Sequence, residues 1–233
     1  MKHILLLSAL LFSLSGFAQK PTPASTDGAG DLEAVLTKMD KASANFKSAQ
    51  ASFQWDQYQK VVDETDVQKG QVYFRRNHNG IDAAFHITSP GAKSIVFKDG
   101  KLRMYEPKID QITERDAGKN KADVEAFMSL GFGGRGHDLL KSYQVKMIGW
   151  ETVDQVKTAR IELVAISAKV HNMLSRVVLW VDPERDISIK QQFFEPSGDY
   201  RLAHYTDIKL NSKISDNVFT LKTTSNTRIV RPQ

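Results

Sequence analysis

The sequence contains no cysteine in its 233 residues. It therefore has no disulfide, no thiolate metal site, no cysteine nucleophile and no N-terminal cysteine to carry a lipid. Charge of one sign is not concentrated either: 32 basic and 27 acidic residues give a formal charge of +5, without any run of five like charges. This scatter does not indicate a nucleic-acid-binding protein. Hydrophobic residues make up 41% of the chain and charged residues 25%, which excludes wholesale disorder and predicts a packed core.

Motifs that would indicate an enzyme are also missing. The histidines beyond residue 18 show no HxH, HExxH or HxxxH spacing, so no metal site is predicted. No GxSxG nucleophile elbow occurs. The glycine-rich segment 131–136 lacks the Gly-Lys-Ser/Thr ending of a phosphate loop and follows a predicted helix, so we interpret it as a loop between two helices. We expect neither catalysis nor a cofactor.

One long apolar stretch is present, and it lies at the N-terminus. The basic Lys2 precedes apolar residues 4–14, and a Gly-Phe-Ala sequence that ends at Ala18 follows. This order is typical of a secretory signal that is cleaved after Ala18. The stretch is shorter than the roughly 20 apolar residues that a membrane-spanning helix needs. The sequence therefore predicts a signal peptide over residues 1–18 and a soluble, exported protein, in the periplasm or outside the cell.

The rest of the chain is predicted to form one domain. Residues 19–30 are rich in Pro, Ser, Thr and Gly, which predicts a flexible lead-in. A helix is expected to begin near Asp31, a good N-cap residue, because apolar side chains recur behind it at helical spacing. No internal repeat and no linker follows, so residues 31–233 are assigned to a single domain. The apolar positions of the helix are Leu32, Val35, Leu36, Met39, Ala42 and Phe46.

Alternation of apolar and polar residues predicts that most of this domain is β-sheet. The period of two is clearest in segments 51–56, 72–75 and 81–88. An Asp-Gly pair at 99–100, between two apolar runs, is the strongest short signal for a hairpin. Further strands are predicted at 95–97, 102–105, 109–115, 144–152, 158–167, 174–182, 186–195, 200–211 and 219–222.

The alternation stops between residues 119 and 143. There, Val124 and Phe127, and then Leu139 and Leu140, have the spacing of two short helices. About eleven strands with this helical insertion predict a mainly β fold. We expect a single curved antiparallel sheet or incomplete β-barrel, with helices covering its open cavity.

One charged residue falls on a predicted strand in an informative position. In the strand 71–77, Val72, Phe74 and Arg76 share one face by the period of two. If the apolar pair faces the interior, Arg76 also points inward and needs a carbonyl or an acid as partner, because a buried unpaired arginine is costly. Alternatively, the strand ends at Arg75 and Arg76 is solvated.

Several segments resemble the periplasmic outer-membrane lipoprotein carrier family, LolA. The central block consists of GQVYFRR at 70–76, Phe85 followed by Ser-Pro at 89–90, and IVFKDGKL at 95–102. Because spacing and residue types agree together, this block carries the resemblance, which extends in weaker form over nearly the whole chain after the signal. The other matching segments lie at 52–54, 105–107, 179–182 and 214–219, with Gln111.

The resemblance implies an incomplete antiparallel barrel covered by helices, around an apolar cavity for lipoprotein acyl chains. It also implies that Arg76 is a lid latch, holding the helical lid through backbone carbonyls. Two positions depart from the family pattern, since Asn77 replaces a proline and Phe85 a tryptophan. The same inward face would also suit an ordinary packed core. The residues expected to line the acyl-chain cavity are Phe53, Trp55, Val72, Phe74, Phe85, Phe97, Met104, Phe127 and Met128.

The implied function is a periplasmic carrier that shields lipoprotein acyl chains and ferries them towards the outer membrane. Each exposed CH2 group costs about 0.8 kcal/mol in water, so a carrier has to enclose the chains. The implied partners are acylated lipoproteins or lipids, an inner-membrane release complex and an outer-membrane acceptor, and a monomer is expected. The alternative is an envelope lipid-binding or sensing module of the same fold, which binds lipid or a membrane-protein partner without transferring lipoproteins. A secreted hydrolase has no motif in its favour.

Removal of the signal peptide is testable by mass. Intact-mass analysis of the exported protein should give a chain that begins at Gln19. Full-length chain that stays in the membrane fraction would contradict the assignment.

Overall fold

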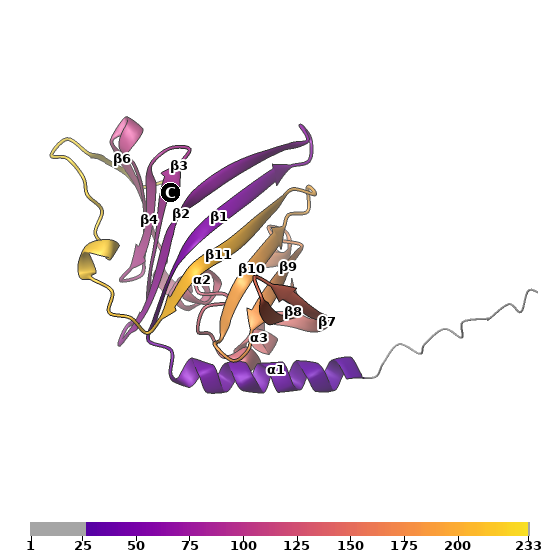
Figure 1. Ribbon diagram of the computed structural model, residues 1–233. Coiled ribbons are helices and arrows are strands. Elements are labelled where there is room, and N and C mark those ends of the chain that lie inside the picture. Colours follow the sequence, from indigo (N-terminus) through magenta and orange to yellow (C-terminus); the bar gives the residue numbers. More distant parts are fainter. Residues whose placement is uncertain (1–26, 233) are drawn as a thin grey trace, which may run out of the picture.

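The computed structural model describes residues 27–232. Their dominant feature is one twelve-stranded sheet (Figure 1). The predicted signal peptide lies outside the described residues. In chain order the strands are β1 (Ser48–Gln59), β2 (Glu64–Asn77), β3 (Gly80–Ser89), β4 (Lys93–Lys98), β5 (Lys101–Glu106), β6 (Gln111–Asp116), β7 (Tyr143–Val153), β8 (Val156–Ala165), β9 (Arg176–Asp182), β10 (Ile187–Phe194), β11 (Tyr200–Leu210) and β12 (Arg228–Val230).

Helices are short apart from the first one. The two helices predicted between residues 119 and 143 are present, as α2 and α3. The first helix begins at Asp27, a few residues before the expected start near Asp31. The α-helices are α1 (Asp27–Ala44), α2 (Lys121–Met128), α3 (Gly136–Ser142) and α4 (Ala168–His171), and the 3-10 helices are η1 (Pro107–Ile109), η2 (Gly118–Asn120) and η3 (Asp216–Phe219). Within residues 27–232, no helix is long and apolar enough to cross a membrane.

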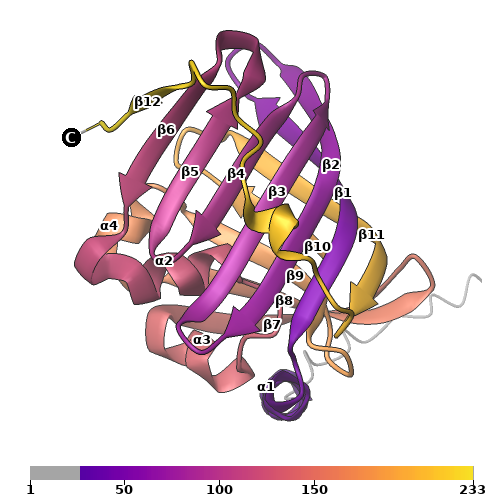
Figure 2. The ribbon, with the colours of Figure 1, turned by 90° about the vertical axis from the view of Figure 1, so that its left-hand side faces the viewer.

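The sheet is open and strongly curved. Its strand order is β12-β6-β5-β4-β3-β2-β1-β11-β10-β9-β8-β7, so the edge strands β12 and β7 do not pair with each other. Figure 2 shows strands β1–β6 in front of β9–β11, with α2 and α3 at one end between the two halves. The fold class predicted from the sequence, a mainly β protein with one curved sheet and covering helices, is confirmed.

Helix α1 covers the concave face of one half of the sheet. Val35, Leu36 and Met39, from the face predicted by helical spacing, are buried against β8 and β9. Ile161 and Leu179 are among their partners on the sheet. Figure 1 shows the helix running along this side of the molecule, next to α3.

Aromatic side chains fill the concave face of the other half. The rings of Phe74 and Phe132 stack with centroids 4.5 Å apart, and Phe85 meets Phe74 edge-on at 5.7 Å. Helix α2 lies over this cluster and reaches from β3 to β10. At one end the Lys121 ammonium donates a hydrogen bond to the Asn79 carbonyl, just before β3. At the other end the Phe127 ring packs against Phe193 of β10.

The hairpin predicted at Asp99-Gly100 connects β4 to β5. Lys98 pairs with Lys101, so the loop has only these two residues. Both have positive φ angles, 52° for Asp99 and 75° for Gly100. A two-residue loop with this backbone matches the twist of the flanking strands.

The C-terminal segment differs from the prediction. No strand covers 219–222, because the apolar residue Phe219 ends the helix η3 and packs with Ile214 on the outer face of the sheet. The last strand is β12, and it pairs in parallel with β6, whereas all the other strand pairs are antiparallel. The apolar residues of this region are evident in the sequence. Their pattern does not reveal that they pack on the outer face of the sheet instead of forming a strand.

Candidate functional site

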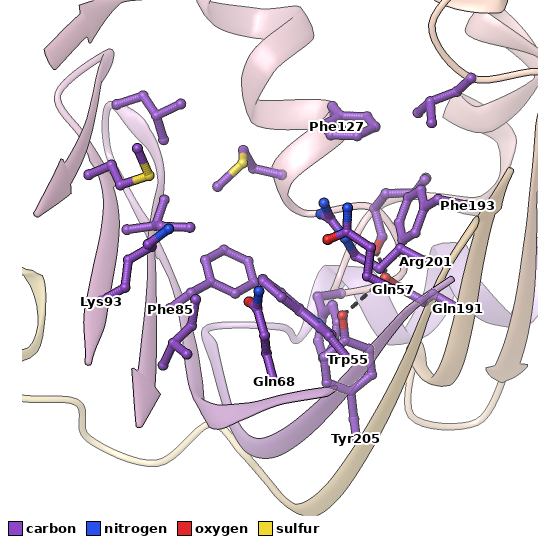
Figure 3. A pocket seen from close by; sticks show the side chains of 18 of the residues that line it. Trp55, Gln57, Gln68, Phe85, Lys93, Phe127, Gln191, Phe193, Arg201 and Tyr205 are labelled. Atoms are coloured by element: carbon purple, nitrogen blue, oxygen red, sulfur yellow. Dashed lines mark hydrogen bonds between the residues drawn. The ribbon is translucent and has the colours of Figure 1, made fainter. Parts of the chain in front are cut away.

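A cavity of about 450 Å³ lies on the concave face, between the two halves of the sheet and α2 (Figure 3). Its size falls within the range of about 300–1,000 Å³ that small-ligand sites occupy. Fourteen of the 20 lining residues are aromatic or aliphatic. The cavity is not fully enclosed, so part of it is open to solvent.

Six of the nine residues predicted to line a cavity are on its wall. The other three, Phe53, Val72 and Phe97, are buried in the core next to it and do not line it. The period of two correctly places them on the concave face, but they are fully buried among their neighbours in the core; the centroid of the Trp55 ring, for example, lies 4.4 Å from that of the Phe53 ring. The six on the wall are Trp55, Phe74, Phe85, Met104, Phe127 and Met128. Their contact with acyl chains stays a prediction.

The character of the wall changes along the strands. On β1, the concave side presents Trp55 and then Gln57, and on β11 it presents Tyr205 and then Arg201. The deep part is therefore aromatic and the outer part is polar. Figure 3 shows the side chains of Gln57 and Arg201 pointing into the same part of the cavity.

Polar groups at the deep end are satisfied by one another. The Gln191 amide donates a 2.6 Å hydrogen bond to the Leu130 carbonyl and accepts one of 3.1 Å from the Tyr205 hydroxyl. Burial raises the pKa of Tyr205, so its hydroxyl stays protonated at physiological pH. Because these polar groups already have hydrogen-bond partners, an apolar molecule at the deep end would leave few of them without a hydrogen bond.

Sequence reasoning missed Phe132, which contributes to the wall from the loop between α2 and α3. A single apolar residue among glycines gave no periodic signal. In the structure Phe132 forms a β-bridge with Ile187, and its neighbour Gly131 accepts a 2.6 Å hydrogen bond from the Ser188 amide. These bonds fix the loop to the beginning of β10. The interpretation of 131–136 as a loop between two helices is confirmed.

We define the lid as residues 121–142, which comprise α2, this loop and α3. The Arg76 guanidinium donates 2.6 Å and 2.8 Å hydrogen bonds to the carbonyls of Gly133 and Ser43. The Ser43 hydroxyl also donates to the Gly133 carbonyl, at 2.7 Å. Strand β2, the end of α1 and the lid are thus joined at one point.

The strand does not end at Arg75, because β2 continues to Asn77. Arg76 is nevertheless exposed at the rim of the sheet, as the alternative expected, and its guanidinium contacts the carbonyls that the resemblance implied. Its role as a latch that opens for cargo stays a prediction.

Gly133 is required at this junction. Its φ angle is 72°, and a Cβ atom added there would lie 2.3 Å from the Phe46 ring. A positive φ is easily adopted only by glycine, and the ring leaves no space for a side chain. The Phe46 ring also lies beneath Arg76, with the guanidinium carbon 5.4 Å from its centroid. The Phe46 ring is therefore in contact with both partners of the junction, Gly133 of the lid and Arg76 of the sheet.

A second connection joins the lid to α1. His137 Nδ1 lies 2.7 Å from Asp40 Oδ2, and its Nε2 lies 3.2 Å from a Glu33 oxygen. The hydrogen bond with Asp40 raises the pKa of His137, and the Glu33 carboxylate acts in the same direction. Protonation of His137 therefore strengthens the attachment of α3 to α1.

Asp186 is a buried acid next to this junction. Its side chain is about 1% exposed, and its oxygens accept no hydrogen bond from residues 27–232. Burial raises the pKa of this carboxyl to about 8; the nearby Arg76 charge opposes the rise and Asp40 adds to it. The Asp186 carbonyl oxygen accepts a 3.0 Å hydrogen bond from the Gly133 amide, so the acid is part of the lid's support.

The sequence matches the model of a known protein family over residues 44–222. That family is described as outer membrane lipoprotein carrier protein LolA. The chain belongs to the LolA family. No curated protein sequence matches this chain. Among residues 27–232, no group of three or more acidic or histidine side chains is arranged to hold a metal ion.

Solved structures resemble this one at low sequence identity, and those with TM-scores of 0.50 or more show a similar fold. An uncharacterized conserved protein from Thermus thermophilus has a TM-score of 0.55 and 10% identity, over 87% of this chain and 99% of the other. A chain from the Pseudomonas aeruginosa MucA/MucB complex has a TM-score of 0.50 and 11% identity, over 82% of this chain. This protein spans 61% of that chain. A LolA superfamily protein from Nitrosomonas europaea shares 18% identity, with a TM-score of 0.40, 82% of this chain and 97% of the other covered.

The acid at the lid junction predicts a pH-dependent stability. Its pKa of about 8 in the folded state lies above the ordinary value, so the contribution of Asp186 to stability is greatest below the ordinary pKa of a carboxyl and falls as pH rises towards about 8. Asp186→Asn is neutral at every pH and should abolish this loss. Urea unfolding at pH 5 and pH 8.5 should show that the variant gains stability over wild type at the higher pH, on the order of a few kcal/mol. An equal difference at both pH values would contradict the raised pKa.

Proposed function

We propose that this protein binds lipoprotein acyl chains in its cavity and carries them through the periplasm towards the outer membrane. The observation that carries the proposal is the 450 Å³ cavity with its largely aromatic and aliphatic wall, at the centre of a LolA-family fold. Transfer of the chains through water would expose their CH2 groups, each at about 0.8 kcal/mol. Enclosure between the curved sheet and α2 removes most of this cost.

The lid supplies a means of opening. Phe127 and Met128 of α2 line the cavity, and the loop behind them is attached to the sheet by Arg76. Cargo that enters beneath α2 would displace the lid and break bonds between Arg76 and the two carbonyls. Part of the binding free energy is then used for opening, which keeps the affinity low enough for release. An inner-membrane release complex and an outer-membrane acceptor are the partners that such a cycle requires.

A second candidate function is an envelope lipid-binding or sensing module that does not transfer lipoproteins. A structure with a similar fold comes from a complex of two proteins, MucA and MucB. That finding favours recognition of a protein partner as an alternative. Transfer of cargo between membranes distinguishes the two functions, since only a carrier delivers it to an acceptor.

A charge inside the cavity should prevent binding of acyl chains. We expect Met104→Glu to weaken binding of a fluorescent fatty-acid probe by more than about tenfold, because the carboxylate would be buried beside the chain. Met173→Glu is the matched control, since Met173 is 58% exposed and does not line the cavity. The wild-type probe signal should saturate and be reversed by lipoprotein. Unsaturable wild-type binding, or equal loss in both variants, would remove support for an acyl-binding cavity.

Loss of the Arg76 contacts should separate binding from release. Arg76→Leu removes the bonds to Ser43 and Gly133, so we expect tighter cargo binding and slower transfer to acceptor membranes. Arg76→Lys should be intermediate, because an ammonium cannot reproduce the planar fork of donors. The measurements are a transfer assay from loaded protein and the dissociation constant of the same cargo. Unchanged release from Arg76→Leu would show that these bonds do not govern opening.

A further inference from the structure

One cationic side chain lies on the wall of the cavity among aromatic residues. The guanidinium carbon of Arg201 is 5.3 Å from the centroid of the Trp55 ring. Arg201 lies on β11 directly between Gln57 of β1 and Phe193 of β10, and all three line the cavity. Figure 3 shows the Arg201 side chain directed into the cavity, where it remains exposed at the polar outer part of the wall. An apolar chain in the cavity would thus lie next to a positive charge.

Arg201 forms no ion pair with any of residues 27–232, unlike other arginines on this half of the sheet. Arg176 pairs with Glu162 at 3.1 Å, and Arg160 approaches Glu151 at 3.5 Å. A guanidinium carries five N–H donors and keeps its charge at any physiological pH. Because Arg201 is exposed at the outer part of the wall, its guanidinium is accessible to an anion that enters the cavity.

Among the described residues, no other charged side chain on the cavity wall forms an ion pair with Arg201. Lys93, on the opposite half of the sheet, lies 3.6 Å from Glu106 and so has an acidic neighbour. Glu195 lines the cavity two residues beyond the Phe193 that pairs with Arg201, but its carboxylate does not come within ion-pair distance of the guanidinium. The Gln57 amide beside Arg201 adds a neutral donor. This part of the wall therefore combines one unpaired cation with a second hydrogen-bond donor.

We propose that Arg201, assisted by Gln57, binds the anionic group of an amphiphile whose acyl chain occupies the cavity. A carboxylate or a phosphate next to the chain fits this chemistry, since either can accept two N–H bonds from a guanidinium. The inference rests on the proposed function, because it requires the cavity to hold the chain. It narrows the cargo from any acylated molecule to those with negative charge close to their chains.

The test compares ligands that share a chain and differ in their head group. Dodecanoate, dodecyl phosphate and dodecan-1-ol are titrated against the fluorescent fatty-acid probe at pH 7.5. Wild type should bind at least one of the anions about tenfold or more tightly than the alcohol, as expected for charge-assisted hydrogen bonds. The anion that binds more tightly identifies the head group as carboxylate or phosphate. Inorganic phosphate without a chain should not displace the probe.

Substitutions test whether Arg201 is responsible for the preference for anionic head groups. Arg201→Gln should lose the preference for the anion and bind dodecan-1-ol as wild type does. Arg201→Lys should retain part of the preference, because charge remains while the fork is lost. Arg176→Gln is the matched control: Arg176 also lies over an aromatic ring, 4.1 Å from the Phe194 centroid, but it does not line the cavity. It should leave binding of all three ligands unchanged.

The possible failures are distinguishable. If wild type binds all three ligands equally, or if Arg201→Gln weakens the alcohol as much as the anions, the head-group inference is wrong while the acyl-binding cavity stands. If no ligand binds to folded wild type, the proposed function itself fails and the inference fails with it.

Discussion

The carbonyl oxygen of Gly133 accepts hydrogen bonds from the Arg76 guanidinium and the Ser43 hydroxyl, and this contact joins the lid to both the sheet and α1. The amide of the same residue donates to the Asp186 carbonyl, just before β10. An open sheet of twelve strands leaves its concave face accessible unless helices are held over it. The position of α2, and with it the closure of the cavity, depends on this junction. Its tight packing also explains why only glycine fits there.

Two ionisable side chains near the cavity lack the partners that such groups often have. The Asp186 carboxyl is buried beside the lid junction, and its two oxygens accept no hydrogen bond from residues 27–232, whereas Arg201 is exposed on the outer cavity wall over Trp55 without an ion pair. A packed core ordinarily excludes a buried carboxyl without partners, because the ionised group loses its hydration without compensation. The roles proposed for the two groups are a pH-dependent stability for Asp186 and recognition of a head group for Arg201.

Much of the fold followed from local patterns. The period of two located most strands, and the Asp-Gly pair at 99–100 located a hairpin, because backbone geometry dictates both signals. The same period placed Phe53 and Phe97 on the concave face but could not tell the cavity wall from the core, since that depends on which neighbouring side chains cover them. Phe219 was assigned to a strand for a similar reason. The sequence identified Phe219 as apolar, but it did not reveal that this side chain packs against the outer face of the sheet, among residues that are mostly distant in the chain.

The sequence by itself determined the fold class, the concave-facing strand positions and, through its resemblance, the carrier family and the position of Arg76. Those conclusions depend on residues close together in the chain, or on a pattern already known from relatives. Tertiary structure alone decided what Arg76 contacts, how Phe132 enters the cavity wall, that the Arg201 side chain forms no ion pair and that the Asp186 carboxyl accepts no hydrogen bond from residues 27–232. These features arise where segments separated by many residues meet. Their energies depend on burial and on distances between atoms, which a single sequence does not contain.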